Sequence, residues 1–292
     1  MFRMQLGVVY PQTEIGAELG AVKGYAQTVE GLGYEHIRIF DHVVGADPAV
    51  YEGWSGAYDI TTQFHEPLVL FGYWAALTSL ELVTSVIIGP QRQTALLAKQ
   101  AAQVDILTEG RFRLGLGVGW NHVEYVALGK DFTDRGARAE EQIELLRRFW
   151  TETSVTHRGP DITVVAAGIA PPPVQRPIPI WIGSNSAVGY RRAGRIGDGW
   201  FPQVAPGPAL DEARAIVDAA ALQAGRDPST LGMEGQVSWR GDLTEVLEQI
   251  EQWHKAGASH LAINTMRAGL ASVEQHLDAL RQIADALGRT AS

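Results

Sequence analysis

Short apolar runs alternate with longer amphipathic segments along the whole chain, and this alternation constrains the fold more than any other feature. Eight runs are predicted to be strands, at residues 5–10, 34–40, 82–88, 112–117, 178–183, 199–203, 234–239 and 260–264. Helical patterns lie at residues 19–31, 66–77, 93–107, 136–151, 186–196, 208–224, 243–256 and 272–287. Most of the predicted strands lack a strict polar–apolar alternation, which is typical of parallel strands covered on both faces.

Eight strand–helix units in one chain predict an α/β fold, the (β/α)8 or TIM barrel. No linker divides the series, so residues 1–292 are expected to form one domain. Two insertions are predicted, residues 43–65 after strand 2 and residues 155–177 after strand 4. The second contains Pro171-Pro172-Pro173, which excludes a helix and predicts an extended excursion. A doubly wound open sheet is the alternative fold, and the even spacing of the units favours closure.

Composition excludes several classes of function. The chain has 33 acidic and 24 basic side chains, a formal net charge of −9 and no basic run, which makes it a poor binder of nucleic acids. It contains no Cys, so disulfides, thiolate metal sites and a cysteine nucleophile are ruled out. The His residues show no metal-ligand spacing, and no Ser lies in a nucleophile elbow. Neither a bound metal nor hydrolase chemistry is therefore predicted.

The sequence also predicts where the protein resides. Its N-terminus has no charged region followed by a long apolar core, unlike a signal peptide. The longest apolar run, residues 67–77, is far shorter than the ~20 residues that a membrane span needs. We expect a cytoplasmic protein that does not contact membranes.

In a barrel of this type the functional groups lie at the carboxyl ends of the strands. Strand 2 ends in Asp41-His42, which places a carboxylate and an imidazole at the barrel mouth. His42 could donate or accept a proton, and Asp41 could bind a polar edge of a cofactor. The alternative, of equal weight on position alone, is that Asp41 caps the loop and His42 is merely hydrogen-bonded there.

Glycines follow strands 3 and 4. Gly89-Pro90 predicts a turn or bulge, which could support a planar ring or be a plain loop. Gly115, Gly117 and Gly119 allow another group to approach the backbone closely. Their spacing differs from the G-x-G-x-x-G dinucleotide fingerprint, so on their own they identify no cofactor.

Strand 5 ends in Gly183-Ser184-Asn185-Ser186, directly before a helix. Free amides at a helix N-terminus can bind phosphate, whereas the alternative is ordinary N-capping by Ser184 or Ser186. Three arginines further along the helix could attract an anionic group, unless they lie on its outer face: Arg191, Arg192 and Arg195.

The insertion after strand 2 is rich in aromatic side chains. A long aromatic loop over a barrel mouth is typical of a substrate lid, and a self-packed surface loop is the alternative. The candidate lid residues are Trp54, Tyr58, Phe64, His65 and Glu66.

Taken together, these segments resemble the luciferase-like monooxygenase superfamily, specifically its actinobacterial branch of F420-dependent oxidoreductases. The resemblance covers nearly the whole chain and depends on the order of short motifs. They are Asp41-His42-Val43-Val44-Gly45-Ala46-Asp47-Pro48, Phe64-His65-Glu66-Pro67, Pro90-Gln91-Arg92, Leu97-Ala98-Lys99-Gln100, Gly110-Arg111-Phe112-Arg113-Leu114-Gly115, Gly117-Val118-Gly119-Trp120-Asn121, Arg135-Gly136-Ala137-Arg138, Trp181-Ile182-Gly183, Gly197-Asp198-Gly199-Trp200 and Asn264-Thr265-Met266.

The resemblance implies a luciferase-like (β/α)8 barrel that binds the deazaflavin F420, or alternatively FMN, at the carboxyl ends of its strands. It implies that Asp41 contacts the cofactor and that His42 is the proton-transfer partner, so that both are catalytic candidates. Ile88-Gly89 or Gly89-Pro90 matches a bulge, often a cis peptide, that backs the ring. The remaining cofactor candidates are Gly117, Gly119, Trp120 and Asn121 beside the ring and Gly183, Ser184 and Asn185 in the phosphate loop. Trp120 stands where some sugar-phosphate dehydrogenases of the family carry a catalytic Glu, which disfavours that activity.

The function expected from the resemblance is hydride transfer between F420 and a small organic substrate at the barrel mouth. One alternative is an FMN-dependent monooxygenase that uses O2 and reduced flavin from a partner reductase. Another is a non-catalytic F420-binding protein. The resemblance also implies a homodimer, and it does not identify the substrate.

Overall fold

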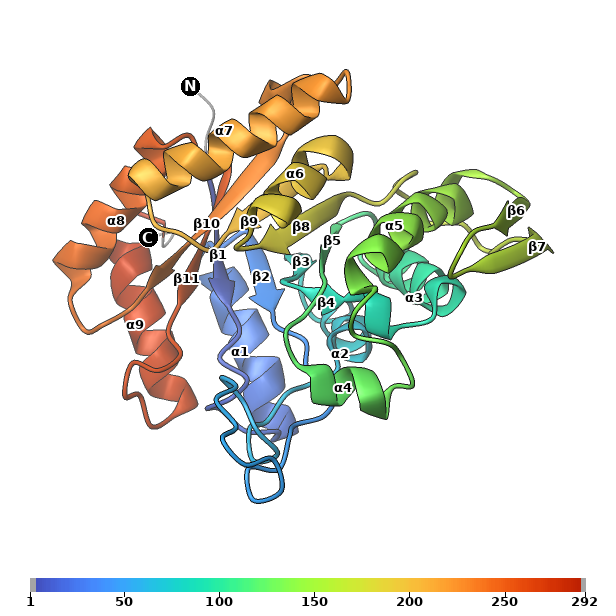
Figure 1. The fold of residues 1–292 in the computed structure, drawn as a ribbon. Coiled ribbons are helices and arrows are strands. Elements are labelled where there is room, and N and C mark those ends of the chain that lie inside the picture. Colours follow the sequence, from blue (N-terminus) through green and yellow to red (C-terminus); the bar gives the residue numbers. More distant parts are fainter. Residues whose placement is uncertain (1–3, 290–292) are drawn as a thin grey trace.

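Strand pairing closes the sheet into a ring in this computed structural model, which describes residues 4–289 (Figure 1). The ring order is β1, β2, β3, β5, β8, β9, β10, β11, and every pairing between these neighbours is parallel. The barrel strands are β1 (Gln5–Val9), β2 (His36–Ile39), β3 (Glu81–Thr84), β5 (Phe112–Gly117), β8 (Ile180–Ser184), β9 (Gly199–Pro202), β10 (Gly232–Ser238) and β11 (His260–Asn264). The predicted (β/α)8 barrel is confirmed, and the pairing of β3 with β5 excludes the open sheet.

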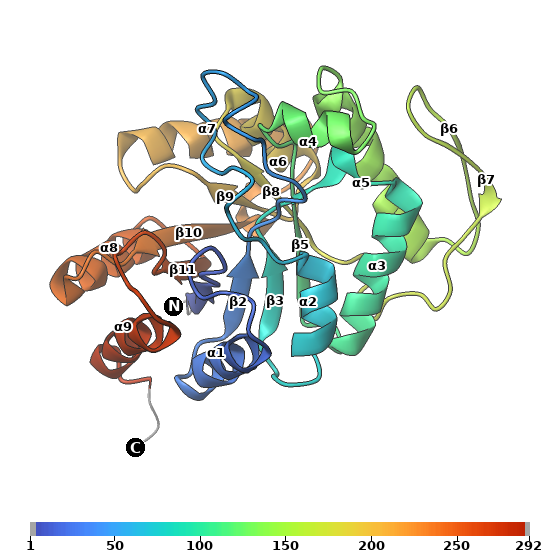
Figure 2. The ribbon, with the colours of Figure 1, turned by 90° about the horizontal axis from the view of Figure 1, so that it is seen from below.

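Helices surround the ring, as Figure 2 shows along a second direction. They are α1 (Leu19–Gly31), α2 (Pro67–Trp74), α3 (Thr94–Leu107), α4 (His122–Ala127), α5 (Arg135–Thr151), α6 (Ala187–Ile196), α7 (Pro208–Gln223), α8 (Leu243–Lys255) and α9 (Val273–Ala286), with 3-10 turns at Gly89–Gln91 and Pro228–Thr230. Side-chain caps begin several of them: Asp242 accepts from the amides of Thr244 and Glu245, and Ser272 accepts from that of Gln275. No helix within residues 4–289 has the length and apolar content for a membrane span.

The two predicted insertions are present. Residues 43–65 form an irregular loop between β2 and α2. After β5 the chain adds α4, α5 and an antiparallel hairpin, β6 (Val155–Arg158) with β7 (Thr163–Ala167), which extends away from the barrel in both views. The sequence did not predict α4 or the hairpin as elements. The proline-rich return to β8 is irregular and non-helical, as expected, with cis bonds before Pro171 and Pro177.

The main core lies between the strands and the helices, where Ile37, Leu82 and Leu114 are fully buried. The apolar clusters on the inner side of the barrel are small. One contains Val9, Ala262 and Met266, and the other contains Val83, Trp181 and Phe201. Much of the barrel interior is instead polar, which separates the stabilising outer layer from an inner layer that can bind a ligand.

Candidate functional site

A cavity of about 920 Å³ opens at the carboxyl ends of the strands. Its lining comes from segments far apart in the sequence, including the ends of β2, β5, β8 and β9. A volume of this size is within the ~300–1,000 Å³ of ordinary ligand pockets. Many of the predicted site residues line it: Asp41, His42, Tyr58, Ile88, Gly117, Gly119, Trp120, Gly183, Ser184 and Asn185.

His42 is oriented by Glu124, a residue that the sequence did not single out. The Nδ1 atom of His42 lies 3.1 Å from Oε2 of Glu124. The backbone amides of Val43 and Val44 donate to the other carboxylate oxygen, at 2.7 and 3.4 Å. Burial acts to raise the pKa of Glu124, but the His42 ring and these amides outweigh it and hold the pKa below its ordinary value. Glu124 is therefore an ionised, fixed acceptor for the imidazole.

Asp41 faces the cavity, but neighbouring protein groups engage its carboxylate. One oxygen accepts from Arg92 at 2.9 Å, and the other accepts from the amide of Ile88 at 3.2 Å. Burial raises the pKa of Asp41, against the opposing effects of Arg92 and the Ile88 amide. These contacts connect the end of β2 to β4 (Ile87–Ile88), so Asp41 organises the wall of the site.

The resemblance implies a bulge, often a cis peptide, at Ile88-Gly89 or Gly89-Pro90. In the structure the cis peptide lies earlier in the chain than either pair. The cis peptide bond joins Ser85 to Val86 and separates β3 from β4, whereas Gly89 and Pro90 begin a 3-10 turn with a trans bond. Ile88 lines the cavity, but Gly89 and Pro90 line a separate buried space behind it. The cis bond thus lies before the predicted positions, and Ser85-Val86 contains no proline to mark it; that Ile88, Gly89 and Pro90 back a cofactor ring stays a prediction.

Two glycines accommodate the side chain of Val86. A Cβ atom added to Gly117 would lie 2.4 Å from Val86, and one added to Gly183 would lie 2.6 Å from it. Both distances are too short for real carbon contacts, so any larger residue would displace Val86. At Gly119, where φ is +67°, an added Cβ would lie 2.8 Å from Ile88. The glycines thus let Val86 and Ile88 form one apolar wall.

Trp120 and Asn121 have different environments. Trp120 lines the cavity, is 43% exposed, and its ring centroid lies 5.6 Å from that of His42. Asn121 is buried, and its side chain caps α4 by accepting from the amide of Val123 at 3.0 Å. The prediction that Asn121 binds the cofactor is not supported by this placement, because the side chain satisfies a helix terminus instead.

The aromatic loop packs against the histidine. Tyr58 lines the cavity with its ring 5.0 Å from His42, and Phe64 lies 4.7 Å from both rings. Trp54 supports the loop from outside, since its Nε1 donates to the carbonyl of Tyr58 at 3.0 Å and its ring contacts Trp120.

The other two lid candidates anchor the loop at its end. His65 contacts the ring of Tyr10 at 5.8 Å, and its amide donates to Gln12. Glu66 caps α2 and pairs with Arg92 at 2.9 Å. Of the five lid candidates only Tyr58 lines the cavity, so a lid role for the other four stays a prediction.

The loop between β8 and α6 provides amides at the cavity rim. Ser186 caps α6 by accepting from the amide of Gly189 at 3.3 Å, while Ser184 and Asn185 remain on the cavity side. Arg135, at the start of α5, also lines the cavity, and its guanidinium lies 3.7 Å above the ring of Phe132. Ser186 also lines the cavity, so the cap of α6 and the two residues before it lie at the same rim.

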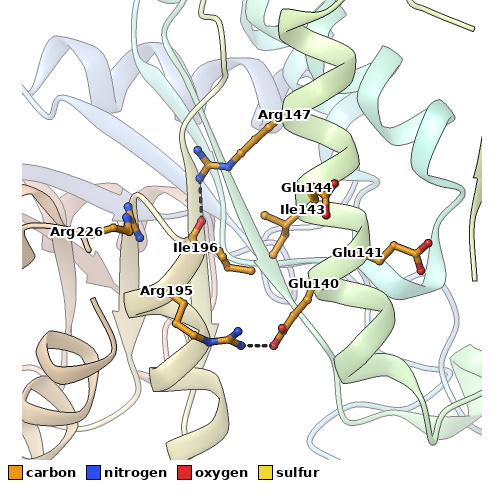
Figure 3. A pocket seen from close by; sticks show the side chains of 8 residues that line it. All are labelled: Glu140, Glu141, Ile143, Glu144, Arg147, Arg195, Ile196 and Arg226. Carbon is orange, nitrogen blue, oxygen red and sulfur yellow. Dashed lines mark hydrogen bonds and ion pairs between the residues drawn. The ribbon is translucent and has the colours of Figure 1, made fainter. Parts of the chain in front are cut away.

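The arginines of α6 differ in placement: Arg191 is exposed, Arg192 is buried, and Arg195 lies at an outer surface. An open pocket of about 490 Å³ lies between α5 and α6 on the outside of the barrel, with charged residues on both sides (Figure 3). There Arg195 pairs with Glu140 at 2.7 Å. Arg192 reaches the same carboxylate at 3.2 Å, but it is buried and lines the separate space behind the cavity. Both guanidiniums are thus engaged by an acidic neighbour and do not line the mouth.

The floor of the cavity contains polar groups that sequence reasoning missed. Arg38 and Gln236 line it, and Glu234 lies beneath them with its side chain fully buried. Glu234 is 3.3 Å from Arg38, 2.8 Å from Arg113 and 3.0 Å from His36, and these neighbours are among the causes that hold its pKa well below the ordinary value despite burial. Within residues 4–289, no three His, Asp or Glu side chains gather as a metal site would need.

Known proteins resemble this chain in sequence and in structure. The family model described as luciferase-like monooxygenase matches residues 3–290. An F420-dependent glucose-6-phosphate dehydrogenase from Kribbella flavida is 28% identical over 243 residues, which cover 78% of this chain and 68% of that protein. An FMNH2-dependent dimethylsulfone monooxygenase from Pseudomonas fluorescens is 32% identical over 161 residues, 53% of this chain and 43% of that protein.

Among solved structures, an F420-dependent secondary alcohol dehydrogenase in complex with an F420–acetone adduct superposes with a TM-score of 0.79. The two chains are 17% identical, and the superposition covers 99% of this chain and 100% of the other. This likeness supports the fold. Because the family model spans nearly the entire sequence, the chain belongs to the luciferase-like monooxygenase family of oxidoreductases, which has both F420-dependent and FMN-dependent members.

Proposed function

We propose that this protein is an F420-dependent oxidoreductase that transfers a hydride between F420 and a small organic substrate at the barrel mouth. One observation carries the proposal. His42 lines the cavity with Nδ1 fixed by Glu124, and its Nε2 makes no hydrogen bond within residues 4–289. An oriented imidazole with one available nitrogen is the arrangement that general acid–base catalysis requires.

The residues around the cavity fit a deazaflavin. Val86 and Ile88 offer an apolar wall for a planar ring. This wall needs glycine at positions 117, 119 and 183, because a Cβ atom there would collide with Val86 or Ile88. The amides of Ser184 and Asn185 and the guanidinium of Arg135 are suited to the phosphate of the cofactor side chain. Asp41 acts indirectly, by holding the amide of Ile88 in the wall.

A deazaflavin, when bound, supplies a carbon centre that transfers hydride and reacts poorly with oxygen. The chain itself moves the proton. With ionised Glu124 accepting from Nδ1, the neutral His42 ring presents Nε2 as a base toward a substrate alcohol. In the opposite direction the protonated ring donates from Nε2 to a carbonyl. Tyr58, Phe64 and Trp120 surround the ring and exclude water from this transfer.

The second candidate function is an FMN-dependent monooxygenase supplied with reduced flavin by a partner reductase. The 32% identity to the FMNH2-dependent dimethylsulfone monooxygenase supports this candidate. The same cavity would then hold a flavin with a shorter, less anionic side chain. The family resemblance also leads us to propose a homodimer, which light scattering would measure.

The first experiment is a pair of fluorescence titrations of the purified protein, one with F420 and one with FMN. Micromolar or tighter binding of F420 with weak binding of FMN is expected, and the reverse preference would favour the monooxygenase. Binding of F420 without redox change for any substrate in a broad alcohol and carbonyl screen would indicate a non-catalytic F420-binding protein.

Replacement of His42 tests the mechanism once a substrate is found. His42→Ala is expected to lower turnover by roughly 10²–10⁴-fold and to leave the Kd for F420 nearly unchanged. His157→Ala is the matched control, because His157 pairs with Glu141 near the β6–β7 hairpin, away from the cavity. Unchanged turnover in His42→Ala would remove this residue from the mechanism.

A further inference from the structure

The floor of the cavity is charged, although barrels of this kind usually fill their interior with branched aliphatic side chains. Arg38 of β2 and Gln236 of β10 lie at the floor, and both line the cavity. Removing such groups from bulk water costs free energy unless they are paired and hydrogen-bonded. Donors at the floor that lack a protein partner are therefore candidates for binding a ligand.

Arg38 is held rigidly but is incompletely bonded. Its side chain is 5% exposed, Nη1 donates to Glu234 at 3.3 Å, and Nη2 donates to the side-chain oxygen of Gln236. The guanidinium also lies over the ring of Phe201, 5.5 Å from its centroid. Its Nε is buried without a partner among the described residues, and a guanidinium has five N–H donors in all. Arg38 is therefore positioned by the protein while several donors remain.

The carboxylate that neutralises Arg38 is shared. Glu234 also receives Arg113 at 2.8 Å and His36 at 3.0 Å. Arg113 has a second carboxylate, Glu81, at 2.9 Å, whereas within residues 4–289 Arg38 pairs with no other acid. The positive charge of Arg38 is thus the less compensated of the two arginines, and it is the one that faces the cavity.

Gln236 extends the set of donors. Its oxygen accepts from Arg38, which leaves its amide nitrogen as the group available to a ligand. Two kinds of N–H donor therefore lie side by side at the floor, one of them charged. A planar group with two acceptor oxygens and a negative charge would match them best.

We propose that Arg38 and Gln236 form a carboxylate-binding subsite for the substrate at the floor of the cavity. Both residues lie in the ring arc β2–β1–β11–β10, whereas the α6 amides assigned to the cofactor follow β8. Arg38 also lies in β2, and His42 follows the end of the same strand. The substrate would then have its carboxylate on Arg38 and an apolar body beneath Tyr58 and Trp120. The identification of this ligand as substrate rests on the proposed function, whereas the subsite itself does not.

Benzoate and benzyl alcohol are suitable probes, because they share a ring and differ in charge. Calorimetric titrations of the full-length protein would be made with each probe, first without cofactor and then with saturating F420. Benzoate is expected to bind about 10-fold or more tightly than benzyl alcohol, as a charge-assisted contact implies. Arg38→Met should abolish this difference. Gln236→Leu should weaken benzoate binding by about 3- to 10-fold.

Arg195→Met is the matched control, since Arg195 lies in the outer pocket, and it should leave both affinities unchanged. Circular dichroism would verify folding, and Gln236→Leu carries the test if Arg38→Met does not fold. Equal affinity for the two probes, no binding of either, or an unchanged preference in the folded variants would overturn the proposal. The proposal would also be overturned if benzoate competed with F420 and Arg38→Met bound F420 more weakly. The donors would then bind the cofactor and not the substrate. Failure of F420 to bind while the benzoate preference persists would reject the proposed function and leave the subsite standing.

Discussion

Two histidine–carboxylate pairs lie inside the barrel, one at the mouth and one at the floor, and they differ in their surroundings. His42 is 3.1 Å from Glu124, and His36 is 3.0 Å from Glu234. At the mouth the remaining partners of the carboxylate are backbone amides, and the imidazole keeps 13% exposure. At the floor both side chains are fully buried, and Arg38 and Arg113 compete for the same carboxylate.

The distance within such a pair therefore does not determine its role. Neutral amides leave the negative charge of Glu124 directed at a single imidazole, and that imidazole faces a cavity. Arg38, Arg113 and His36 all contact the carboxylate of Glu234, so its negative charge is shared among them. The imidazole of His36 is fully buried and has no access to a ligand. We therefore expect the mouth pair to affect turnover and the floor pair to affect stability.

Replacing Glu234 should give the largest change in stability. Glu234→Gln keeps the shape of the side chain but leaves Arg38 and Arg113 buried beside a neutral group. Breaking a buried pair from one side costs about 3–5 kcal/mol in the free energy of unfolding. Urea denaturation followed by circular dichroism would measure it. Glu152→Gln, at a solvent-screened pair with Arg148 on α5, is the control and should leave the free energy of unfolding nearly unchanged. A loss below about 1 kcal/mol in Glu234→Gln would mean that the floor network contributes little to folding.

Replacing Glu124 should change turnover more than stability. Glu124→Gln keeps a hydrogen-bonding side chain but removes the charge that fixes His42. A hydrogen bond to a charged group is worth about 1.5–3 kcal/mol, so turnover should fall by roughly 10- to 100-fold. The pH dependence of turnover should move with it, because the imidazole loses its charged partner. Glu141→Gln, at the outer pair with His157, is the matched control. An unchanged pH profile would show that Glu124 only holds the loop.

The fold could be predicted because its signal is periodic and repeated. The expected segments 112–117, 260–264 and 19–31 coincide with β5, β11 and α1. The hairpin was missed because β7 is mostly exposed and has no partner but β6, so no core pattern marks it. The expected strand at 82–88 is two strands, and no proline signals the cis bond between Ser85 and Val86.

The site could be predicted only where its residues are neighbours in sequence. Asp41 and His42 were found because they follow one strand. Glu124 is 82 positions from His42, and Glu234 is 198 from His36, so only the closed ring brings them together. The sequence did not predict that Asn121 caps α4, because a side chain that caps a helix and one that binds a ligand have the same local pattern.

The floor should also make stability depend on pH in a range where carboxylates do not titrate. Burial, with Arg113 nearby, lowers the pKa of His260 to about 3, below the 6.5 of an unperturbed histidine. Below about pH 6.5 the unfolded chain takes up a proton at this site and the folded chain does not. Stability should therefore fall as the pH drops from about 6.5 to 5, by about 0.7 kcal/mol per unit near pH 6.5 and by about 1.4 kcal/mol per unit near pH 5 for this group.

His260→Gln tests this dependence through its slope and not through absolute stability. The slope of unfolding free energy against pH should decrease by about 0.7 kcal/mol per unit near pH 6.5 and by about 1.4 kcal/mol per unit near pH 5. His254→Gln, on the outer helix α8, is the matched control for the substitution itself. If the slope of His260→Gln equals that of the unmodified protein, His260 protonates in the folded state and the floor is less desolvated than its burial implies.

The smallest effect is expected outside the barrel, where the same charged groups face water. Arg195→Met removes a partly exposed ion pair with Glu140 in the outer pocket and should leave the affinity for F420 unchanged. Arg135→Met, at the cavity rim, should instead weaken F420 binding by roughly 10-fold, because it removes a cation suited to phosphate. Fluorescence titration of both variants measures the contrast. Equal losses of F420 affinity would mean that the cofactor tail reaches the outer pocket, and the distinction between a functional interior and a structural exterior would then fail at α6.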